Sequence, residues 1–425
     1  MLNQFAKAWW PWLRKNSKHN WWEKFKELLV FFTVFSFTSN LFLKLSVNDA
    51  YLNGLLVDYL IPKVYIFDCF LLIKLIIFLS NKKNYQIFKK NKIKLKKIDI
   101  IILIFLSIFF INLLLQLNLN LIIFCLRIIL IIFFIFSPYL DQKKQKLVYK
   151  ALSLSIIWQS FLAYFQFIKQ TPLAPYYIFG ETNLRHFAAI SRAQFLTIEK
   201  ILPYGSTAHP NILAGIIGIF SILLIDKKQN NRLLVILLLL NAFAICLITQ
   251  SLSAFLTLCL FLIYLLIKKI NWQKKINLIV FSFFILSPLL IKKLDANLLK
   301  THLSISRRAI LNEAAWKMFL DKTFFGVGAN NFVKELENYS HHQETVRFVQ
   351  PAHHLGLLLL SEGGLLFSSI LLLLGIKFKK KINWSKLLIL TPIASLDHYL
   401  ITQALGLFTL FLFIFLTRNR GQSRT

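Results

Sequence analysis

The chain has 425 residues, of which 57% are hydrophobic and 16% are charged, and its formal net charge is +32 at pH 7. A water-soluble domain has roughly a quarter of its residues charged, so this composition excludes an ordinary soluble fold and favours apolar segments that lie in lipid. The positive charge does not indicate nucleic-acid binding, because no recognition motif accompanies it and the basic residues form short clusters between apolar runs.

Twelve apolar segments are predicted to be membrane-spanning helices, because the core of a bilayer needs roughly 20 helical residues to cross it. The sequence therefore predicts an all-α membrane protein with about 12 transmembrane helices. In chain order, the predicted spans are residues 28–46, 59–79, 98–116, 119–137, 149–168, 209–225, 233–249, 252–267, 276–291, 353–376, 387–400 and 404–417.

The segment ahead of the first span combines tryptophan with lysine and arginine. Its tryptophans are Trp9, Trp10, Trp12, Trp21 and Trp22. This composition is typical of an interfacial segment that lies on anionic lipid headgroups. We therefore divide the chain into a cytoplasmic interfacial segment, residues 1–27, and a polytopic membrane domain, residues 28–425.

Basic residues concentrate on one side of the predicted spans. Of the 50 Lys and Arg residues, 33 lie in residues 1–27, 80–97, 141–150, 226–232, 268–275, 377–386 and 418–425. None lies in the short connections on the other side, which are residues 47–58, 117–118, 250–251 and 401–403. The positive-inside rule then predicts that both termini are cytoplasmic. Two long loops, 169–208 and 292–352, are predicted to be extracytoplasmic.

A run of small and polar residues, Gly205–Gly215, opens the sixth predicted span with the letters GSTAHPNILAG. Such a run can leave free backbone N–H groups at the positive end of a helix, which suits an anionic group. His209 and Asn211 are therefore candidate substrate contacts. An ordinary helix cap with proline in the first turn is the alternative, and spacing alone favours it.

An arginine pair, Arg307 and Arg308, lies in the second outer loop. Two guanidinium groups just outside a membrane can bind phosphate oxygens in a bidentate manner. The glycines of the following Gly326–Gly328 allow a tight turn with close backbone approach. A solvated amphipathic helix followed by a turn is the alternative.

Two histidines, His353 and His354, open the tenth predicted span, and Gly364 follows eleven residues after the first of them. Eleven residues are about three helical turns, so we expect His353 and Gly364 to share a helix face, with the histidine pointing into the outer mouth of the bundle. An ionisable residue at a membrane boundary favours a functional role. A structural hydrogen bond is the alternative.

Two further groups of polar residues carry weaker signals. No metal site is expected from the outer-loop histidines and Glu344, because adjacent histidines on a helix point apart. These histidines are His341, His342, His353 and His354. The residues Asp397-His398-Tyr399, between the last two spans, are expected to help close the outer face.

In this order, the motifs resemble the O-antigen ligase and O-antigen polymerase superfamily of bacterial membrane glycosyltransferases. The resemblance covers about residues 200–415. It rests on His209–Gly215, on Arg308–Phe332, and on His353 with Gly364. The chain departs from the family pattern at His354, Phe367 and Leu202.

The resemblance implies an enzyme of the bacterial plasma (inner) membrane with its active site on the extracytoplasmic side. Such enzymes transfer a glycan from undecaprenyl pyrophosphate to a hydroxyl of a glycan or glycolipid acceptor, without a cofactor, a metal or a nucleotide sugar. Catalytic roles are then expected for His353, which would take the acceptor proton, and for Arg308, which would stabilise the leaving pyrophosphate. Substrate contacts are expected from Arg307, Arg185, Arg192, His209, Asn211 and His354.

Two alternatives stay open at the level of sequence. A polymerase of the same superfamily would add repeat units to a growing chain, whereas a ligase joins a finished chain to a different acceptor. A transporter or flippase for a lipid-linked sugar is the alternative of another class. Transporters place ionisable residues near the bilayer midplane, and Lys74 and Arg127 are the main intramembrane charges of this chain.

Overall fold

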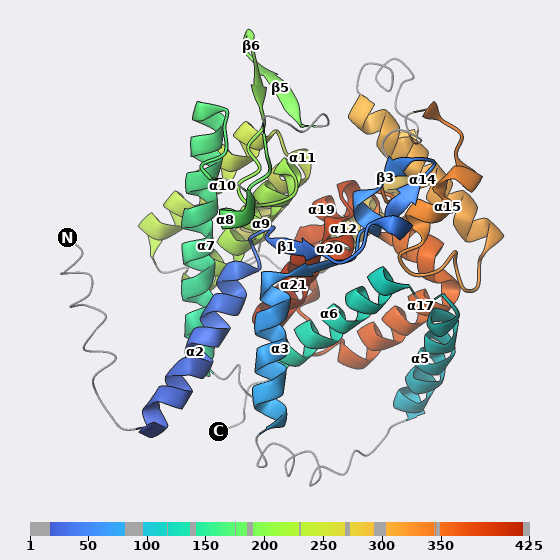
Figure 1. Ribbon diagram of the computed structural model, residues 1–425, viewed down its shortest axis with the longest axis horizontal. Helices are drawn as coiled ribbons and strands as arrows, with labels where there is room; N and C mark the ends of the chain where they lie inside the picture. Colours follow the sequence, from blue (N-terminus) through green and yellow to red (C-terminus); the bar gives the residue numbers. More distant parts are fainter. Residues whose placement is uncertain are drawn as a thin grey trace.

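The computed structural model describes residues 18–80, 97–116, 118–136, 142–174, 176–184, 190–228, 231–267, 273–292, 303–343, 345 and 349–419. This part of the chain is mostly helical, and its short strands form three two-stranded antiparallel sheets within the connections (Figure 1).

A helix overlaps each predicted span. Eleven of the spans correspond to α2 (Lys18–Ser36), α3 (Ile66–Leu79), α5 (Lys97–Leu115), α6 (Leu119–Phe136), α7 (Gln142–Lys169), α9 (Pro210–Lys228), α10 (Arg232–Thr249), α11 (Leu252–Ile267), α12 (Gln273–Lys292), α17 (Leu355–Phe378) and α21 (Ala404–Thr417). The remaining span, residues 387–400, is instead a series of short helices: α18 (Trp384–Leu387), η3 (Leu388–Leu390) and α19 (Thr391–Leu396).

Short elements make up the connections. The strands are β1 (Phe42–Lys44), β2 (Tyr51–Leu52), β3 (Leu55–Leu56), β4 (Lys63–Tyr65), β5 (Arg192–Phe195) and β6 (Ile198–Ile201). They pair β1 with β4, β2 with β3, and β5 with β6. The other helices are η1 (Asn48–Ala50), η2 (Asp58–Leu60), α8 (Tyr176–Phe179), α14 (Leu303–Asp321), α15 (Phe332–Tyr339) and α20 (Tyr399–Thr402).

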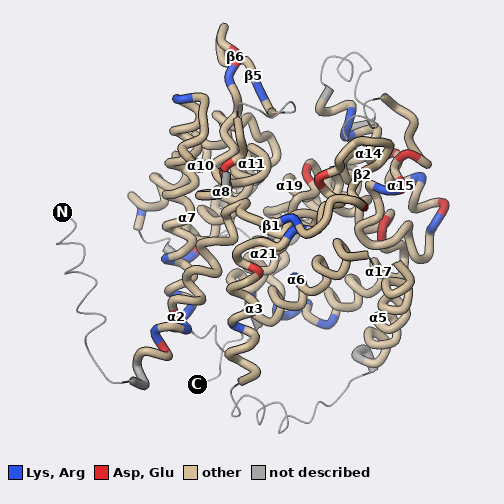
Figure 2. The backbone as a smooth tube through the Cα atoms, viewed as in Figure 1, with Lys and Arg blue, Asp and Glu red and all other residues tan. Residues whose placement is uncertain are grey.

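The helices have the length and composition of membrane helices. Four are long and apolar enough to cross a bilayer: Lys144–Lys169, Pro210–Lys227, Arg232–Thr249 and Leu355–Phe378. Shorter apolar helices accompany them, including Ile100–Leu115, Leu119–Ile135 and Leu252–Ile267. Figure 2 shows long stretches of α5 and α10 without charged residues. Several long apolar helices thus point to a membrane protein, as the composition predicted.

The two predicted outer loops lie on the same side of the molecule. Figure 1 shows the β5–β6 hairpin, from the first loop, and α14, from the second loop, at the upper edge. The elements far apart in sequence that approach this side can therefore contribute to one site.

The first two spans differ from their predicted bounds. The helix α2 ends at Ser36, ten residues before the predicted end, and the chain then enters β1. Pro62 has no N–H and favours extended backbone in the preceding residue, and β4 follows it directly. The second helix therefore begins only at Ile66 rather than at residue 59.

The predicted interfacial segment is partly described. Its last residues belong to α2, and the exposed rings of Trp21 and Trp22 stack with Phe25. Lys26 lies 5.8 Å from the Trp22 ring. An exposed aromatic cluster beside a lysine fits the predicted contact with headgroups. The other tryptophans of the segment, Trp9, Trp10 and Trp12, lie outside the described residues.

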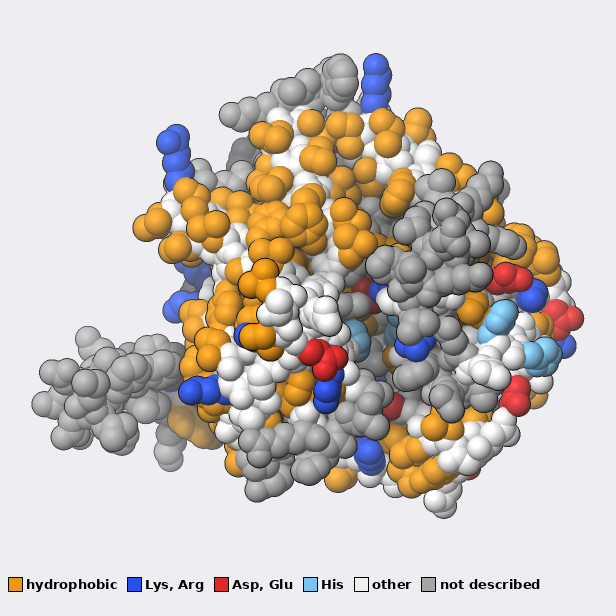
Figure 3. Space-filling view, turned by 90° about the horizontal axis from the view of Figure 1, so that it is seen from above, with side chains coloured by type: hydrophobic (Ala, Val, Ile, Leu, Met, Phe, Trp, Pro, Cys, Tyr) orange, Lys and Arg blue, Asp and Glu red, His pale blue; other side chains and the backbone are white. Residues whose placement is uncertain are grey.

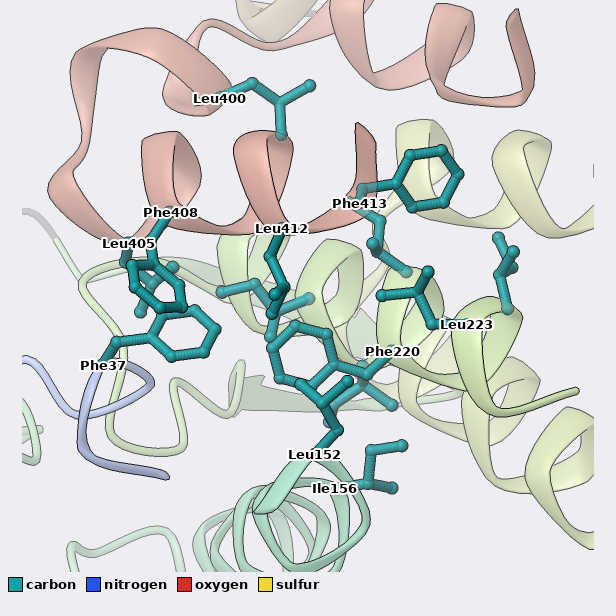
Figure 4. Packing of buried hydrophobic residues seen from close by; sticks show 14 of the residues in the cluster. Phe37, Leu152, Ile156, Phe220, Leu223, Leu400, Leu405, Phe408, Leu412 and Phe413 are labelled. Atoms are coloured by element: carbon teal, nitrogen blue, oxygen red, sulfur yellow. The ribbon is translucent and has the colours of Figure 1, made fainter. Parts of the chain in front are cut away.

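The core is built around α9. This helix packs against α7, α10, α11 and α21, and most of it is buried, whereas only 28% of α10 is buried. Phenylalanines from distant segments meet beside it: Phe37 lies 4.4 Å from Phe408 and 5.6 Å from Phe220, ring centre to ring centre (Figure 4). The start of α9 is consequently held at a fixed place in the bundle.

The buried charge on α6 is paired. The Arg127 side chain donates from Nε and Nη2 to the Asp68 carboxylate at 2.8–3.2 Å, and Nη2 also donates to the Lys63 carbonyl oxygen at 2.6 Å. The same carboxylate accepts the Tyr65 N–H at 2.9 Å, which caps α3. A buried pair with these additional hydrogen bonds serves to hold β4 against α6.

The tenth span bends where a turn of the second outer loop enters it. Gly364 has φ of +60° and interrupts α17. There, the carbonyls of Ser361 and Glu362 accept the N–H groups of Val327 and Gly328 at 2.8 and 3.0 Å. The prediction that His353 and Gly364 share a helix face is therefore wrong, because α17 begins only at Leu355 and breaks at Gly364. The glycine accommodates a turn rather than a neighbouring helix.

Replacing Gly364 with alanine is expected to destabilise the protein. A Cβ atom would lie 2.4 Å from the Phe324 carbonyl oxygen, and the positive φ alone costs about 1–3 kcal/mol for other residues. The Gly375→Ala variant is the control, since its Cβ would meet only the Trp384 ring at 3.4 Å. We expect a clearly lower melting temperature in detergent for Gly364→Ala and no loss for Gly375→Ala; equal melting temperatures would contradict this account.

Candidate functional site

The centre of the candidate site is Asp397, which lies where the eleventh span is broken. α19 ends at Leu396, and Asp397 takes up extended backbone before α20 begins. Its buried carboxylate accepts a hydrogen bond from Ser253 Oγ of α11 at 2.5 Å. The Asn211 amide of α9 donates to the other oxygen at 3.4 Å. Residues from three separate parts of the chain thus converge on one negative charge.

His353 faces this carboxylate. Its Nδ1 lies 3.8 Å from Asp397 Oδ1, an ion-pair distance that is too long for a hydrogen bond. Its Nε2 lies 3.3 Å from Gln350 Oε1, and its side chain is 14% exposed. The Nδ1 atom is buried and has no hydrogen-bond partner among the described residues. Such an imidazole can rotate or shift slightly to engage Asp397 or a ligand.

Arg308 reaches the same turn from α14. Its Nε donates to the Leu396 carbonyl oxygen at 3.1 Å, and its Nη1 donates to Ser304 Oγ at 2.7 Å. Since Leu396 directly precedes Asp397, the guanidinium and the His353 imidazole meet at one place. Both are on the side that carries the two outer loops. In the view of Figure 3, histidine side chains are visible near the centre of this face.

His209 caps the helix that it precedes. Its Nδ1 accepts the Asn211 N–H at 3.2 Å, and its carbonyl oxygen accepts the N–H groups of Ile212 and Leu213. Its Nε2 lies 3.3 Å from Ser191 Oγ. His209 therefore lies at the edge of the site, with one nitrogen used to begin α9.

Three backbone N–H groups in the turn before α9 already have side-chain partners. Gln166 Oε1 accepts from the N–H groups of Tyr204 and Gly205, and Gln159 Oε1 accepts from that of Ser206, at 2.8–3.0 Å. These bonds favour the capping alternative for Tyr204–Ser206, and the anion-binding interpretation of the segment stays a prediction. Its contribution to the site is the position of His209 and Asn211.

His398, expected only to help close the outer face, lies in the site together with Tyr59, which the sequence did not single out. The rings of His398 and His353 lie 4.9 Å apart, centre to centre. His398 Nε2 lies 3.5 Å from the Tyr59 hydroxyl, and its Nδ1 lies 2.7 Å from Thr402 Oγ1. The signal that could have identified Asp397 and His398 was their place in a segment otherwise predicted to be membrane-embedded.

Of the other predicted substrate contacts, His354 and Arg192 have partners outside this centre. His354 is buried and caps α17: its Nδ1 accepts the Leu357 N–H, and its Nε2 lies 3.0 Å from the Phe284 carbonyl oxygen. We therefore assign it a structural role instead of substrate contact. Arg192 lies on the β5–β6 hairpin, exposed and paired with Glu199 at 3.3 Å.

The remaining two predicted substrate contacts are Arg307 and Arg185. Arg307 is half-buried on α14 beside Arg308, and Arg185 lies outside the described residues. Among the described residues, no group of three or more His, Cys, Asp and Glu side chains is arranged to hold a metal ion. Glu344, considered above with the outer-loop histidines, is not among them.

The negative charge at the centre of the site is the carboxylate of Asp397. Although burial raises the pKa of the Asp397 carboxyl, its interactions with His353 and Arg308 outweigh burial and lower the pKa to about 2. Loss of hydration lowers the pKa of the buried His398 below the usual range. Its imidazole is therefore neutral near pH 7.

Replacing Asp397 with asparagine is expected to reduce a reaction that uses His353 as a base by about 10²-fold or more, because the charge that stabilises the protonated ring is lost. Asparagine retains the size of the side chain and can still accept from Ser253. The matched control is Asp321→Asn, since Asp321 is exposed and only accepts the Tyr339 hydroxyl at 2.6 Å. An Asp397→Asn variant with unchanged activity would exclude this role.

The same variant has an expected dependence on pH. A carboxyl with a pKa of about 2 in the folded protein and about 3.9 in the unfolded chain stabilises the fold fully above about pH 4. This stabilisation is lost as the pH falls toward about 2. The difference in melting temperature between wild type and Asp397→Asn should thus be constant from about pH 5 to 8 and shrink below about pH 4. A difference that grows on acidification would contradict the lowered pKa.

Comparison with known proteins does not assign a function to this site: no protein-family model matches the chain, and neither does any curated protein.

Proposed function

We propose that the protein is a membrane glycosyltransferase, similar to O-antigen ligases, that moves a glycan from undecaprenyl pyrophosphate to a hydroxyl acceptor. The observation that carries the proposal is the convergence of an imidazole, a carboxylate and a guanidinium at one turn. His353 and Arg308 come from different parts of the second outer loop and meet at Leu396–Asp397. A base and a phosphate-binding group side by side are what such a transfer requires.

In the proposed step, the acceptor oxygen attacks the anomeric carbon of the lipid-linked sugar. The bond from that carbon to the pyrophosphate oxygen breaks, and the pyrophosphate leaves with the electron pair. The acceptor proton passes to His353. The carboxylate of Asp397, 3.8 Å away, stabilises the resulting imidazolium. Ser253 and Asn211 hold that carboxylate in place.

The proposed role of Arg308 is to bind the pyrophosphate leaving group. A guanidinium has five N–H donors, and two of those of Arg308 are used by Leu396 and Ser304. The others have no partner among the described residues and can bind the pyrophosphate oxygens. His398, whose imidazole is neutral near pH 7, adds no second positive charge near the reacting centre. Arg307, one residue away on α14, is a further candidate for the same headgroup.

The proposed location in the cell follows from the predicted spans and from the distribution of basic residues. We propose a multi-pass protein of the bacterial plasma membrane with about 12 spans and both termini in the cytoplasm. The active site then lies on the extracytoplasmic side, where the two outer loops are. The lipid-linked donor would enter from the bilayer, and the acceptor from the aqueous side.

A transporter or flippase receives less support from the intramembrane charges. Arg127 is occupied by Asp68 and the Lys63 carbonyl, so it is not available to a substrate at the bilayer midplane. Lys74 lies with its ammonium 3.7 Å from the Phe134 ring and near the end of α3. Among the described residues, a buried imidazole nitrogen without a hydrogen-bond partner, His353 Nδ1, lies instead at the outer site.

The test is transfer by the purified protein. It would be mixed in detergent or nanodiscs with the undecaprenyl-linked oligosaccharide of the producing bacterium and with candidate acceptors, and the products would be sized. A ligase gives one transfer to a different acceptor, and a polymerase gives a ladder of repeat units. Absence of both products with active, folded protein, together with movement of the intact lipid-linked sugar across a bilayer, would replace the proposal with the transporter alternative.

A further inference from the structure

A polar cavity lies beside the end of η2. It has a volume of about 70 Å³. Leu60, at the end of η2, lines this cavity, and the preceding residue, Tyr59, lies with its hydroxyl 3.5 Å from His398. The polar residues of the lining are Ser46, Asp49, Asn118, Asn120, Asn330 and Lys334. A single short helix therefore contributes residues to both the cavity and the site.

Four of these polar side chains have no internal partner. Within the described part of the chain, the side chains of Ser46, Asp49, Asn330 and Lys334 make no hydrogen bond or ion pair. Asp49 and Lys334 line the same cavity with opposite charges yet are not paired with each other. Donors and acceptors that converge on a cavity without internal partners are free to bind a polar ligand.

Two other side chains of the lining are held in fixed positions. The Asn120 amide donates to the Tyr59 carbonyl oxygen at 3.0 Å, and Asn118 Oδ1 accepts the Leu121 N–H at 2.9 Å. The first of these bonds ties the cavity wall to the residue that contacts His398. The carboxamides are thereby oriented before any ligand arrives, which reduces the entropy lost on binding.

A second cavity shares one lining residue with the first and is otherwise lined differently. Its volume is about 270 Å³, and Lys334 lines both cavities. Five aliphatic side chains contribute to its walls: Leu52, Leu55, Val333, Leu336 and Val349. At its edge, the Asn53 amide donates to Glu337 Oε2 at 2.6 Å, which joins the β2–β3 hairpin to α15. Together the two cavities reach the lower end of the roughly 300–1,000 Å³ typical of ligand sites.

We propose that the two cavities form a glycan subsite that binds sugar units adjacent to the reacting one; this inference rests on the proposed function. Carboxamides that both donate and accept match neighbouring sugar hydroxyls, and aliphatic walls match the C–H faces of pyranose rings. The opposite charges of Asp49 and Lys334 favour a ligand without net charge. An anionic lipid headgroup would meet the Asp49 carboxylate and is not favoured.

The experiment measures binding apart from catalysis. The probe is the oligosaccharide released by mild acid from the lipid-linked glycan of the producing bacterium, titrated into the detergent-solubilised full chain in a calorimeter. Asp49→Ala/Lys334→Ala removes two side chains without breaking an internal bond, and its Kd is expected to rise about tenfold. Glu313→Ala/Lys317→Ala is the matched control, because it removes an exposed ion pair of 3.2 Å on α14, and its Kd should stay within about twofold of wild type.

The outcomes separate this inference from the proposed function. Wild-type protein that does not bind the oligosaccharide, or an Asp49→Ala/Lys334→Ala variant that binds it as wild type does, would overturn the subsite even if transfer occurs. Binding that weakens as expected, in a protein that transfers no glycan from undecaprenyl pyrophosphate, would support the subsite and overturn the proposed function. Where transfer occurs, the substrate whose KM rises about tenfold in the variant, donor or acceptor, is the one whose glycan lies in the cavities.

Discussion

The His353→Ala variant is expected to transfer glycan about 10²–10⁴-fold more slowly than wild type, which is the usual contribution of a general base. Its level and melting temperature should change little. The side chain contacts Gln350 at 3.3 Å and Asp397 at 3.8 Å, and the carboxylate retains its bonds from Ser253 and Asn211 when the imidazole is removed. The measurement is the initial rate of transfer by purified protein at saturating donor and acceptor.

The outer loop provides matched controls for this variant. His341 and His342 are exposed histidines a few residues earlier, so His341→Ala and His342→Ala remove the same ring from the same loop. Both should retain wild-type activity. If His353→Ala retains activity as well, the general-base role is excluded; if all three lose activity together, the loop as a whole matters rather than this imidazole.

The Arg308→Ala variant is expected to have a kcat about 10²–10³-fold lower than wild type. Removing one preorganised hydrogen-bond donor to a developing negative charge has an effect of this size in other enzymes. The effect should fall on kcat more than on KM, because charge accumulates on the pyrophosphate as the glycosidic bond breaks. Arg308→Lys should recover only part of the rate, since an ammonium cannot bind two oxygens in the planar geometry of a guanidinium.

A variant of a surface arginine is the control for the loss of one positive charge. Arg192 lies on the β5–β6 hairpin and is paired with Glu199, so Arg192→Ala removes one charge from the same side of the molecule. It should reduce the rate by less than about twofold at physiological salt. Equal losses for Arg308→Ala and Arg192→Ala would show that net charge, and not the position of Arg308, determines the rate.

These expectations depend on a geometry that the sequence predicted only in outline. The sequence indicated that His353 and Arg308 belong to outer loops, because the apolar spans and the basic clusters define the two sides. It did not indicate that both would meet at Asp397, which was expected only to help close the outer face. The carboxylate was missed because the segment 387–400 had the composition of a continuous span, whereas Asp397 lies beyond the end of α19.

Competition for hydrogen bonds explains the other differences. The sequence pattern of Gly205–Gly215 allows either an anion site or a cap, and the choice depends on Gln159 and Gln166, about 40–50 residues earlier, which occupy the backbone donors. His354 was expected to contact the substrate beside the catalytic His353. Its ring is directed to Phe284 on α12, while that of its neighbour is directed to Asp397.

What the sequence by itself determined is the set of apolar helices, since the thickness of a bilayer and the hydrogen bonding of a helix are local requirements that a run of about 20 residues meets or does not meet. Only the tertiary structure decided which polar side chains share a site and where helices break. It also decided which of the two histidines faces Asp397 and which one caps a helix. Those depend on contacts between residues far apart in the chain, as when α9, α11, α14 and the turn after α19 meet around Asp397, and no local pattern encodes them.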